Sequence, residues 1–415
     1  MTAPELLTTI TAAVLLQLLA GFGLSLWRKR AAAPALNEEP APPAAPGSGA
    51  WPGWREFRVV KRHFEDAARS QCSFHLQAVD GVALTPFLPG QYLTFSLKLP
   101  ASAAGSTAGE RSITRCYSLS DRPDPAGWRI TVKRVPPPAD RPELPPGLSS
   151  NHFHDRVQEG DVLLVKAPAG HFHIDAQTSL PVVLIAGGIG ITPMMSMLRW
   201  CVAEQPTRPV HLYYGVRNQA DHAFKATLEE LAASHPALRL HVVYSSPQPG
   251  DVPGRDFQHA GRVDVDLLRR SLPHGRHQFY VCGPPAMMQS LVPALRDWGV
   301  QAGDIHFEAF GPATVRPATP TTHEPPSDAA TALEVRFSRT GRTLAWSGQD
   351  ANLLDFAERH DLALDSGCRS GSCGACQTRL LSGVVTYAEP PDHDIAKGHC
   401  LLCVGKPQSA LVLEA

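Results

Sequence analysis

The chain has 415 residues, of which 38 are basic and 39 acidic, and its formal net charge is −1. This length exceeds what one ordinary hydrophobic core organises, so we expect two to four domains. The near-neutral charge gives no electrostatic reason to expect nucleic acid as a partner. Nine cysteines in 415 residues are too few for a disulfide scaffold, so their spacing is more informative than their number.

The first 30 residues carry a predicted membrane anchor. Residues 6–27 are 22 consecutive residues without a charge, and a helix of that length spans about 33 Å, enough to cross a bilayer core. The basic triplet at 28–30 follows at once, so the positive-inside rule places the N-terminus outside and the bulk of the chain in the cytoplasm. A cleaved signal peptide would carry its positive charge before the apolar run, so we favour an uncleaved single-pass anchor over residues 1–30.

Two proline-rich stretches are predicted to be linkers. Residues 31–50 hold five Pro and eight Ala, and residues 312–330 hold five Pro. Neither stretch has enough large apolar side chains to build a core, so both should be extended spacers. They divide the remaining chain into residues 51–311 and 331–415.

Residues 51–180 show short runs in which apolar and polar residues alternate, separated by Gly and Pro. Alternation with a period of two is typical of half-buried strands, and many short strands with turn signals between them predict an antiparallel β-barrel. The runs that carry this prediction are 55–62, 91–99, 128–135 and 161–168.

From residue 181 to 311 the pattern changes to apolar strands that alternate with helical segments. This alternation predicts an α/β domain with a parallel sheet of the nucleotide-binding kind. The predicted strands end near 186 and lie at 209–216, 238–245 and 277–284, and helices are predicted after 192 and at 224–234.

Two motifs lie in the predicted barrel. Arg115, Tyr117 and Ser118 belong to the run RCYSLS, which by itself favours an ordinary barrel strand over a binding motif. Downstream, Gly147 to Ser150 open a short predicted helix, whose free backbone N–H groups could receive a phosphate.

Three motifs lie in the predicted α/β domain. Glycines at 187, 188 and 190 follow a buried strand, and a helix with an early proline follows them; this suits the approach of a pyrophosphate, although it is not the six-residue dinucleotide fingerprint. The run CGPPAM begins at Cys282 after another apolar strand, where a purely structural cysteine is the alternative. The run FEAFGP, from Phe307, ends the domain.

The cysteines near the C-terminus have the spacing of an iron–sulfur site. Cys368, Cys373 and Cys376 form C-x4-C-x2-C, the plant-type [2Fe–2S] arrangement. Zinc is the alternative, because Cys373 and Cys376 could pair with Cys400 and Cys403, but that pairing leaves Cys368 without a use. Spacing alone leaves the fourth ligand open between Cys403 and Cys400.

Together these motifs resemble the ferredoxin–NADP reductase superfamily. Residues 51–311 look like the FAD and NAD modules of flavohemoglobin reductases and phthalate-dioxygenase-type reductases. Residues 331–415 resemble the β-grasp (α+β) ferredoxin domain fused to such reductases, with a hairpin over 333–347 that turns at Gly341 and a helix near 351–360. The resemblance implies a barrel FAD domain at 51–180, an NAD(P) domain at 181–311 and a ferredoxin domain at 331–415.

The resemblance also assigns roles to individual residues. The residues implied for FAD are Arg115, Tyr117, Ser118, Lys133, Gly147, Ser149, Ser150 and Phe310, with Arg134 in the same pocket. Those implied for NAD(P) are Gly187, Gly188, Gly190, Thr192, Cys282, Gly283 and Pro284. Ser118, Cys282 and Glu308 would lie at the site of hydride transfer, and Cys368, Cys373, Cys376 and Cys403 would hold the cluster.

The expected function is an NAD(P)H-dependent reductase that passes electrons from NAD(P)H through FAD and a [2Fe–2S] cluster to a protein acceptor, such as an oxygenase. NADH is favoured, because Ser246 stands where NADPH-using relatives carry an arginine, although Arg217 and Arg255 could substitute. Three alternatives stay open: a subunit active only within a fixed membrane complex, a free flavin or oxygen reductase, and a zinc-stapled scaffold that has lost its flavin.

Overall fold

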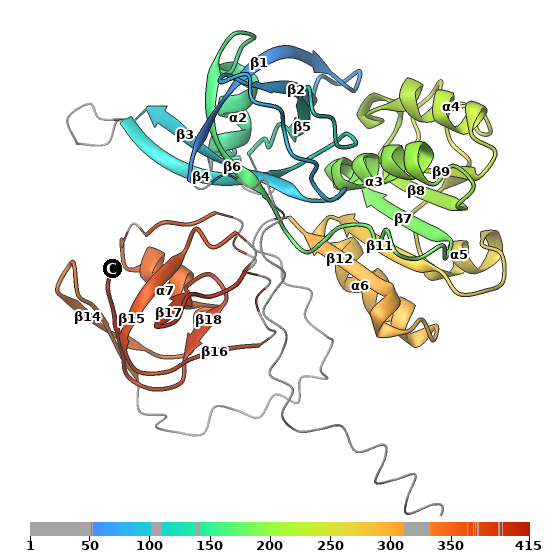
Figure 1. Cartoon of the computed structure of the whole chain (residues 1–415). Coiled ribbons are helices and arrows are strands. Elements are labelled where there is room, and N and C mark those ends of the chain that lie inside the picture. Colours follow the sequence, from blue (N-terminus) through green and yellow to red (C-terminus); the bar gives the residue numbers. More distant parts are fainter. Residues whose placement is uncertain are drawn as a thin grey trace, which may run out of the picture. The chain divides into compact units, whose positions relative to one another are not determined.

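The computed structural model describes residues 51, 53–100, 110–137, 142–143, 145–310, 333–362, 364–367, 369, 371, 373–388, 391 and 393–415 (Figure 1). These residues fall in one unit, Ala50–Ala415. The predicted anchor at 1–30, both predicted linkers and Cys368 lie outside the described residues. Within the described part of the chain, no helix is both long and apolar enough to span a membrane.

The first domain is a six-stranded antiparallel sheet in the order β4-β3-β6-β1-β2-β5. A bridge between Leu119 and Ile130 and a hydrogen bond of 2.8 Å from the Ser120 amide to the Arg129 carbonyl join the end of β4 to β5, so the sheet closes into the predicted barrel. The strands are β1 (Arg55–Phe64), β2 (Gln71–Ala78), β3 (Tyr92–Pro100), β4 (Glu110–Ser118), β5 (Trp128–Lys133) and β6 (Val162–Ala169).

The barrel interior is filled by alternating apolar side chains and sealed by one short helix. Phe57 and Val59 of β1 are fully buried, while their neighbours on the strand face outward. Helix α2 (Leu148–Asp155) contributes Phe153, whose ring lies edge-on to those of Phe74, Phe95 and Tyr117 at centroid distances of 5.2, 5.5 and 4.9 Å. This aromatic cluster fixes α2 against the strand that carries Tyr117.

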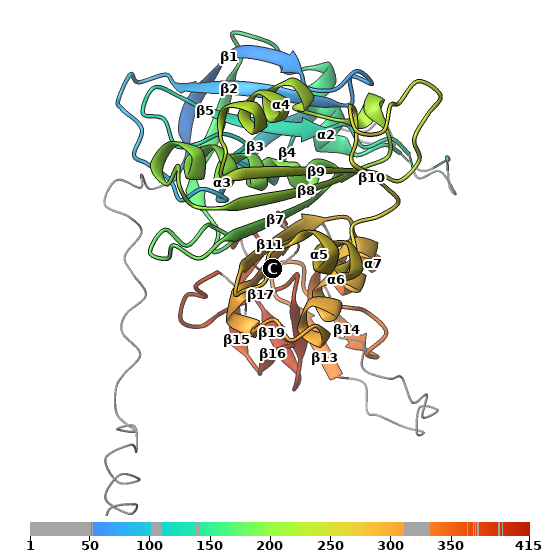
Figure 2. The same ribbon diagram turned by 90° about the vertical axis from the view of Figure 1, so that its right-hand side faces the viewer.

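The second domain is a parallel sheet in the order β10-β9-β8-β7-β11-β12. In Figure 2, α3 and α4 lie along one face of this sheet and α5 and α6 along the other. The strands are β7 (Val182–Gly187), β8 (Val210–Val216), β9 (Leu238–Tyr244), β10 (His259–Ala260), β11 (Gln278–Gly283) and β12 (Ile305–Ala309), and the helices are α3 (Ile191–Glu204), α4 (Lys225–Ser234), α5 (Val265–Ser271) and α6 (Pro285–Asp297).

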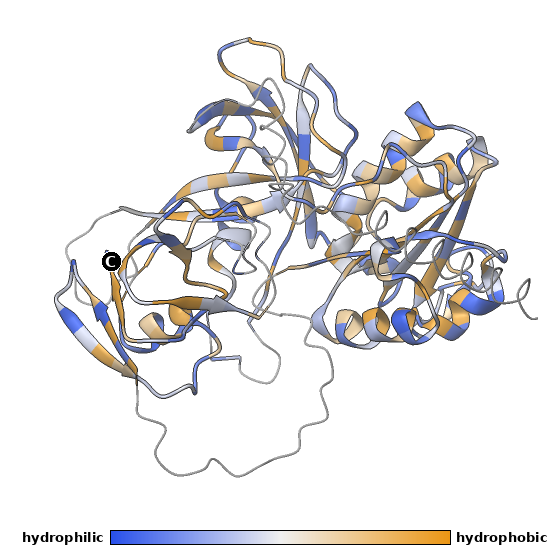
Figure 3. Cartoon of the chain, turned by 60° about the horizontal axis from the view of Figure 1, so that its bottom comes forward, coloured by the Kyte–Doolittle hydropathy of each residue, from blue (hydrophilic) through white to orange (hydrophobic). Residues whose placement is uncertain are grey.

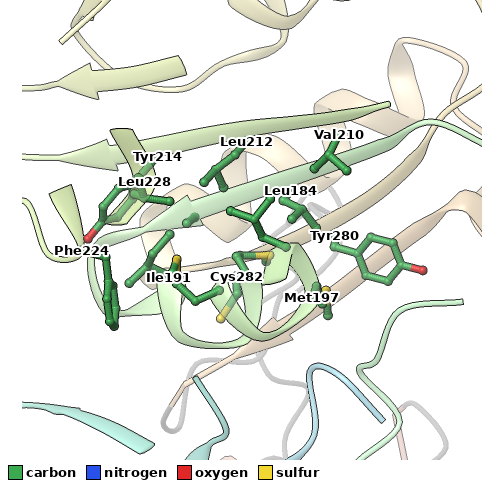
Figure 4. Packing of buried hydrophobic residues seen from close by; sticks show 14 of the residues in the cluster. Leu184, Ile191, Met197, Val210, Leu212, Tyr214, Phe224, Leu228, Tyr280 and Cys282 are labelled. Carbon is green, nitrogen blue, oxygen red and sulfur yellow. The ribbon is translucent and has the colours of Figure 1, made fainter. Parts of the chain in front are cut away.

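Both faces of this parallel sheet are buried, which explains its continuous apolar strands. Every residue of β7 and β11 is buried. One core, shown in Figure 4, packs Leu184, Leu212 and Tyr280 against Ile191 and Met197 of α3. A second core on the opposite face joins the sheet to α5 and α6. Both of these helices carry hydrophilic as well as hydrophobic residues (Figure 3). The predicted α/β domain is thus confirmed.

The C-terminal domain has a five-stranded mixed sheet in the order β14-β13-β19-β15-β17 and a two-stranded sheet of β16 and β18. Gly341 has a φ of +69° in the turn of the β13–β14 hairpin, as predicted. Asn352 caps the N-terminus of helix α7, and its side chain accepts a hydrogen bond from the Asp355 amide at 2.9 Å. The elements are β13 (Leu333–Phe337), β14 (Arg342–Trp346), α7 (Leu353–Arg359), β15 (Gln377–Ser382), β16 (Val385–Tyr387), β17 (His399–Leu401), β18 (Gly405–Pro407) and β19 (Leu411–Leu413).

Candidate functional site

The glycine turn predicted to receive a pyrophosphate lies where the strand order of the parallel sheet reverses. From β7 the chain proceeds to β8, β9 and β10 on one side, and later to β11 and β12 on the other. Ligands of open α/β sheets bind at this switch point, outside the carboxyl ends of the strands. Gly187 ends β7, a 3₁₀ turn covers Gly188–Gly190, and α3 begins at Ile191.

Each glycine of this turn is required for a different reason. Gly188 has a φ of +53°, and a Cβ added there would meet only the Lys133 Nζ, at 3.8 Å. Its backbone therefore faces space that a phosphate could enter, beside an ammonium group from β5. Gly190 is instead a close-packing position, because an added Cβ would lie 2.1 Å from the Cys282 carbonyl oxygen. Thr192 is buried, and its hydroxyl donates to the Ile189 carbonyl at 3.0 Å, which stabilises the first turn of α3.

The two barrel motifs predicted to bind FAD meet in space. The Tyr117 hydroxyl donates to the Ser149 Oγ at 3.1 Å, which links β4 to the first turn of α2. Burial raises the pKa of Tyr117 to about 12, so the phenol stays protonated as a donor. Gly147 packs so closely that an added Cβ would lie 2.8 Å from both the Ser150 Oγ and the Val135 Cβ. Ser118 is buried on the strand that carries Tyr117.

The two arginines predicted for the FAD pocket differ in their contacts. Arg115 is partly buried on β4, and its Nη1 donates to the Thr114 carbonyl at 2.7 Å. Arg134 instead binds α2: its guanidinium lies 2.6 Å from the Asp155 carboxylate and 2.9 Å from the Asn151 Oδ1. These contacts tie Arg134 to α2, and its place in the FAD pocket stays a prediction.

Cys282, Glu308 and Phe310 lie at the carboxyl ends of β11 and β12. Cys282 pairs with Glu308 in the register of these two strands. The Cys282 thiol is enclosed in the apolar core near Ile191 (Figure 4), and burial raises its pKa well above the ordinary value. It therefore stays a protonated, packed thiol in this structure, and its contact with a nicotinamide stays a prediction. Pro284 precedes α6, and Phe310 packs at the edge of the same core.

The C-terminal cysteines lie in a loop that packs closely around sulfur. The Cys403 amide approaches the Cys376 Sγ at 3.5 Å, and a Cβ added to Gly367 would lie 2.6 Å from the Cys373 Sγ. Gly371 and Gly374 have φ values of +80° and +68°. Left-handed glycines and amides directed at sulfur suit thiolate ligation of an iron–sulfur cluster, so the described residues fit that group.

Cys400 has a different position from Cys403. It lies on β17 opposite Thr378 of β15 and is 1% exposed, so it belongs to the regular sheet. Cys403 follows that strand in a turn and approaches Cys376 through its amide.

The contacts that hold the barrel against the parallel sheet could not be predicted from motifs. Arg129 of β5 is 7% exposed and lies 3.4 Å from Asp121, which also accepts the Arg199 Nε of α3 at 2.8 Å. The Arg129 guanidinium also lies 5.0 Å from the Phe224 ring. The sequence places Arg129 in a predicted strand but does not reveal these partners, because they come from other segments of the chain.

Comparison with known proteins places these sites in a family. Residues 184–292 match the family described as "Oxidoreductase NAD-binding domain", and residues 336–408 match "2Fe-2S iron-sulfur cluster binding domain". The flavohemoprotein of Rhizobium meliloti (strain 1021) is 38% identical over 265 residues, which cover 64% of this chain and 62% of that protein. The chain thus matches less than two thirds of the length of this relative.

Two solved structures extend the comparison. The FAD/NAD-binding domain of nitric oxide dioxygenase from Vibrio cholerae is 32% identical, with a TM-score of 0.52, and the match covers 62% of this chain and 99% of that one. Phthalate dioxygenase reductase is 28% identical, with a TM-score of 0.52, and the match covers 88% of this chain and 98% of that one. The chain therefore belongs to the ferredoxin reductase-like family of FAD- and NAD-binding modules, joined here to a C-terminal [2Fe–2S] domain.

Within this family the chain is an NAD(P)H oxidoreductase, and its cofactors are FAD, NAD(H) and a [2Fe–2S] cluster. The expected class and cofactors are confirmed.

Proposed function

We propose that this protein carries electrons from NADH through FAD and the [2Fe–2S] cluster to a protein acceptor, such as an oxygenase. The observation that carries the proposal is that residues predicted for the flavin, nucleotide and cluster sites contact one another in the structure. Tyr117 bonds to Ser149, Lys133 reaches Gly188, and Cys403 approaches Cys376. The likeness to phthalate dioxygenase reductase, described as a modular structure for electron transfer from pyridine nucleotides to [2Fe–2S], supports the same order of carriers.

When bound, FAD would supply the conversion of two-electron into one-electron transfer, and a cluster held by the C-terminal cysteines would supply one-electron transfer. The chain's own residues provide position and exclude water. The open backbone at Gly188, with Lys133 beside it, would bind oxygens of the NADH pyrophosphate. The first turn of α2, at Ser149 and Ser150, would bind oxygens of the FAD pyrophosphate. The packed Cys282 and Gly190 keep the floor of the site rigid, which favours a fixed distance between the reacting rings.

The cluster assignment is tested by a matched pair of cysteine variants. We propose Cys368, Cys373, Cys376 and Cys403 as the ligands, so Cys403→Ser should lose the iron–sulfur absorption and the iron content of the purified protein. Cys400→Ser should keep both, because Cys400 lies within the sheet. Loss of iron in Cys400→Ser with retention in Cys403→Ser would reverse the assignment.

The electron route is tested by anaerobic titration of the full chain with NADH. Flavin bands should bleach first, and the cluster should be reduced afterwards. Cys373→Ser should still oxidise NADH with ferricyanide but fail to reduce the protein acceptor. If that variant supports the natural acceptor at the wild-type rate, the protein is a free flavin or oxygen reductase. If the purified wild type reduces neither ferricyanide nor cytochrome c, it works only within a larger complex.

We also propose that residues 1–30 anchor the protein in a membrane, with the catalytic domains in the cytoplasm. The 22 uncharged residues and the basic triplet behind them support this proposal. Expression of the full chain and of a chain that starts at residue 51 tests it. The full chain should sediment with membranes and resist high-salt extraction, while the shorter chain should not; equal extraction of both would refute the anchor.

A further inference from the structure

Beyond the carboxyl ends of β8 and β9, hydrogen bonds hold Arg217 and Ser246 side by side. The Ser245 amide donates to the Val216 carbonyl at 2.9 Å, and the Ser246 amide donates to the Arg217 carbonyl at 2.8 Å. Strand β8 is also the direct neighbour of β7, which ends in the phosphate turn. Arg217 therefore directly follows the strand beside the phosphate turn.

This edge is where the adenosine half of a dinucleotide is expected. In nucleotide-binding α/β sheets the pyrophosphate lies on the first turn, and the ribose extends over the end of the next strand. An acidic residue there hydrogen-bonds the 2′-hydroxyl of NAD, whereas an arginine accommodates the 2′-phosphate of NADP. Both kinds of residue occur here, so their mutual contacts decide which nucleotide fits.

The Arg217 guanidinium is already occupied by a carboxylate. Its Nε lies 2.5 Å from the Asp221 Oδ2, and its Nη2 lies 3.1 Å from the Asp221 Oδ1. The Arg217 side chain is 71% exposed, but that of Asp221 is only 9% exposed. The Asp221 backbone carbonyl also accepts the Gln71 Nε2 of the barrel at 3.1 Å, which anchors the backbone of this residue to the barrel.

The second nearby arginine is paired in the same way. The Arg255 Nη2 and Nε lie 2.8 and 3.2 Å from the Asp256 Oδ2, and the Asp256 side chain is 2% exposed. A phosphate is best bound by a guanidinium that can present two N–H groups to it. Each of the two guanidinium groups thus presents its Nε–Nη2 edge to a buried carboxylate.

We propose that the Arg217–Asp221 ion pair makes the nucleotide site selective for NADH over NADPH. Asp221 holds the Nε–Nη2 edge of the guanidinium, and its negative charge opposes a second anion at the same place. The adenosine ribose of NADH carries only a hydroxyl there and needs no free cation. This inference rests on the proposed function, because it assigns the nucleotide preference of that same site.

The experiment measures kcat/KM for NADH and for NADPH with ferricyanide, using the full chain loaded with FAD and cluster. Wild type should prefer NADH. Asp221→Asn keeps the shape of the side chain but frees the guanidinium, so the NADPH-to-NADH ratio of kcat/KM should rise about tenfold or more, as expected for a new charge-assisted hydrogen bond to phosphate. Adding Arg217→Ala to that variant should abolish the gain.

Two further variants keep the test decisive. Asp297→Asn makes the same charge change at an exposed position at the end of α6, and it should leave the ratio unchanged. Ser246→Arg adds an unpaired guanidinium at an exposed position beside Arg217 and should raise the ratio even if Asp221→Asn folds poorly.

The outcomes separate this inference from the proposed function. An unchanged ratio in a folded Asp221→Asn, a gain that survives Arg217→Ala, or a wild type that prefers NADPH would each overturn the role of the ion pair. An unchanged ratio in Ser246→Arg would overturn the placement of the ribose. If the wild type oxidises neither nucleotide, the proposed function itself fails.

Discussion

Mild acid should destabilise this protein through histidines that are buried in the uncharged form. His211 and His222 are 5% and 3% exposed. His211 lies among His241, His277 and the nearby charge of Arg239, and His222 bonds through Nδ1 to the Tyr244 hydroxyl at 2.9 Å. Burial lowers the pKa of each to about 4, from an ordinary value of 6.5.

The sign and the size of the effect follow from the difference between folded and unfolded states. Between pH 6.5 and 4 the unfolded chain binds a proton at each histidine and the folded chain does not, so stability falls as the pH falls. From pH 7 to pH 5 each histidine should lower the free energy of unfolding by about 2 kcal/mol, and the two together by about 4 kcal/mol. That is a large part of the 5–15 kcal/mol typical of a domain.

Urea unfolding of the holoprotein at pH 7 and pH 5, followed by circular dichroism, measures the effect. His211→Asn removes one of these protons, so its loss of stability between the two pH values should be about 2 kcal/mol smaller than that of the wild type. His274→Asn, a matched change at an exposed histidine, serves as the control. An equal loss in wild type and His211→Asn would refute the reasoning.

Two further predictions concern the nucleotide and flavin sites. Gly190→Ala places a Cβ 2.1 Å from the Cys282 carbonyl oxygen and should lower the free energy of unfolding by about 3 kcal/mol. Gly303→Ala, where an added Cβ meets nothing within 4 Å, is the control and should leave that free energy nearly unchanged. Thermal denaturation of both variants checks this, and equal melting temperatures would contradict it. Tyr117→Phe removes the hydrogen bond to Ser149 and should lower the free energy of unfolding by about 1 kcal/mol in urea titrations at pH 7, so a variant as stable as the wild type would show that this bond contributes nothing.

Much of the fold could be predicted because its elements have strong local patterns. The strand predicted at 209–216 is β8 at Val210–Val216, and the helix predicted at 224–234 is α4 at Lys225–Ser234. Strand β2 shows the same alternation, with Cys72, Phe74 and Leu76 in the barrel core and Gln71, Ser73 and His75 on the opposite face. Those polar residues are partly or fully buried by tertiary contacts, as Gln71 shows by bonding to the Asp221 carbonyl.

The parts of the functional site that could be predicted are likewise those with a local sequence pattern. Glycine turns, the run RCYS and the cysteine spacing are local in sequence, because each depends on backbone conformation or on ligands a few residues apart. They were sufficient to predict an FAD, NAD(P) and [2Fe–2S] reductase, and the comparisons confirm that class.

Only the tertiary structure decided what the charged side chains do. The family resemblance placed Arg134 in the FAD pocket, and the structure adds that its guanidinium pairs with Asp155 of α2. From the sequence Arg217 was a candidate to bind a 2′-phosphate, and the structure shows that its guanidinium forms an ion pair with Asp221. The sequence alone determined which cofactor chemistry this chain carries, because backbone turns and ligand spacing are written locally. The structure decided which charges remain available to a ligand, because an ion pair depends on residues that only folding brings together.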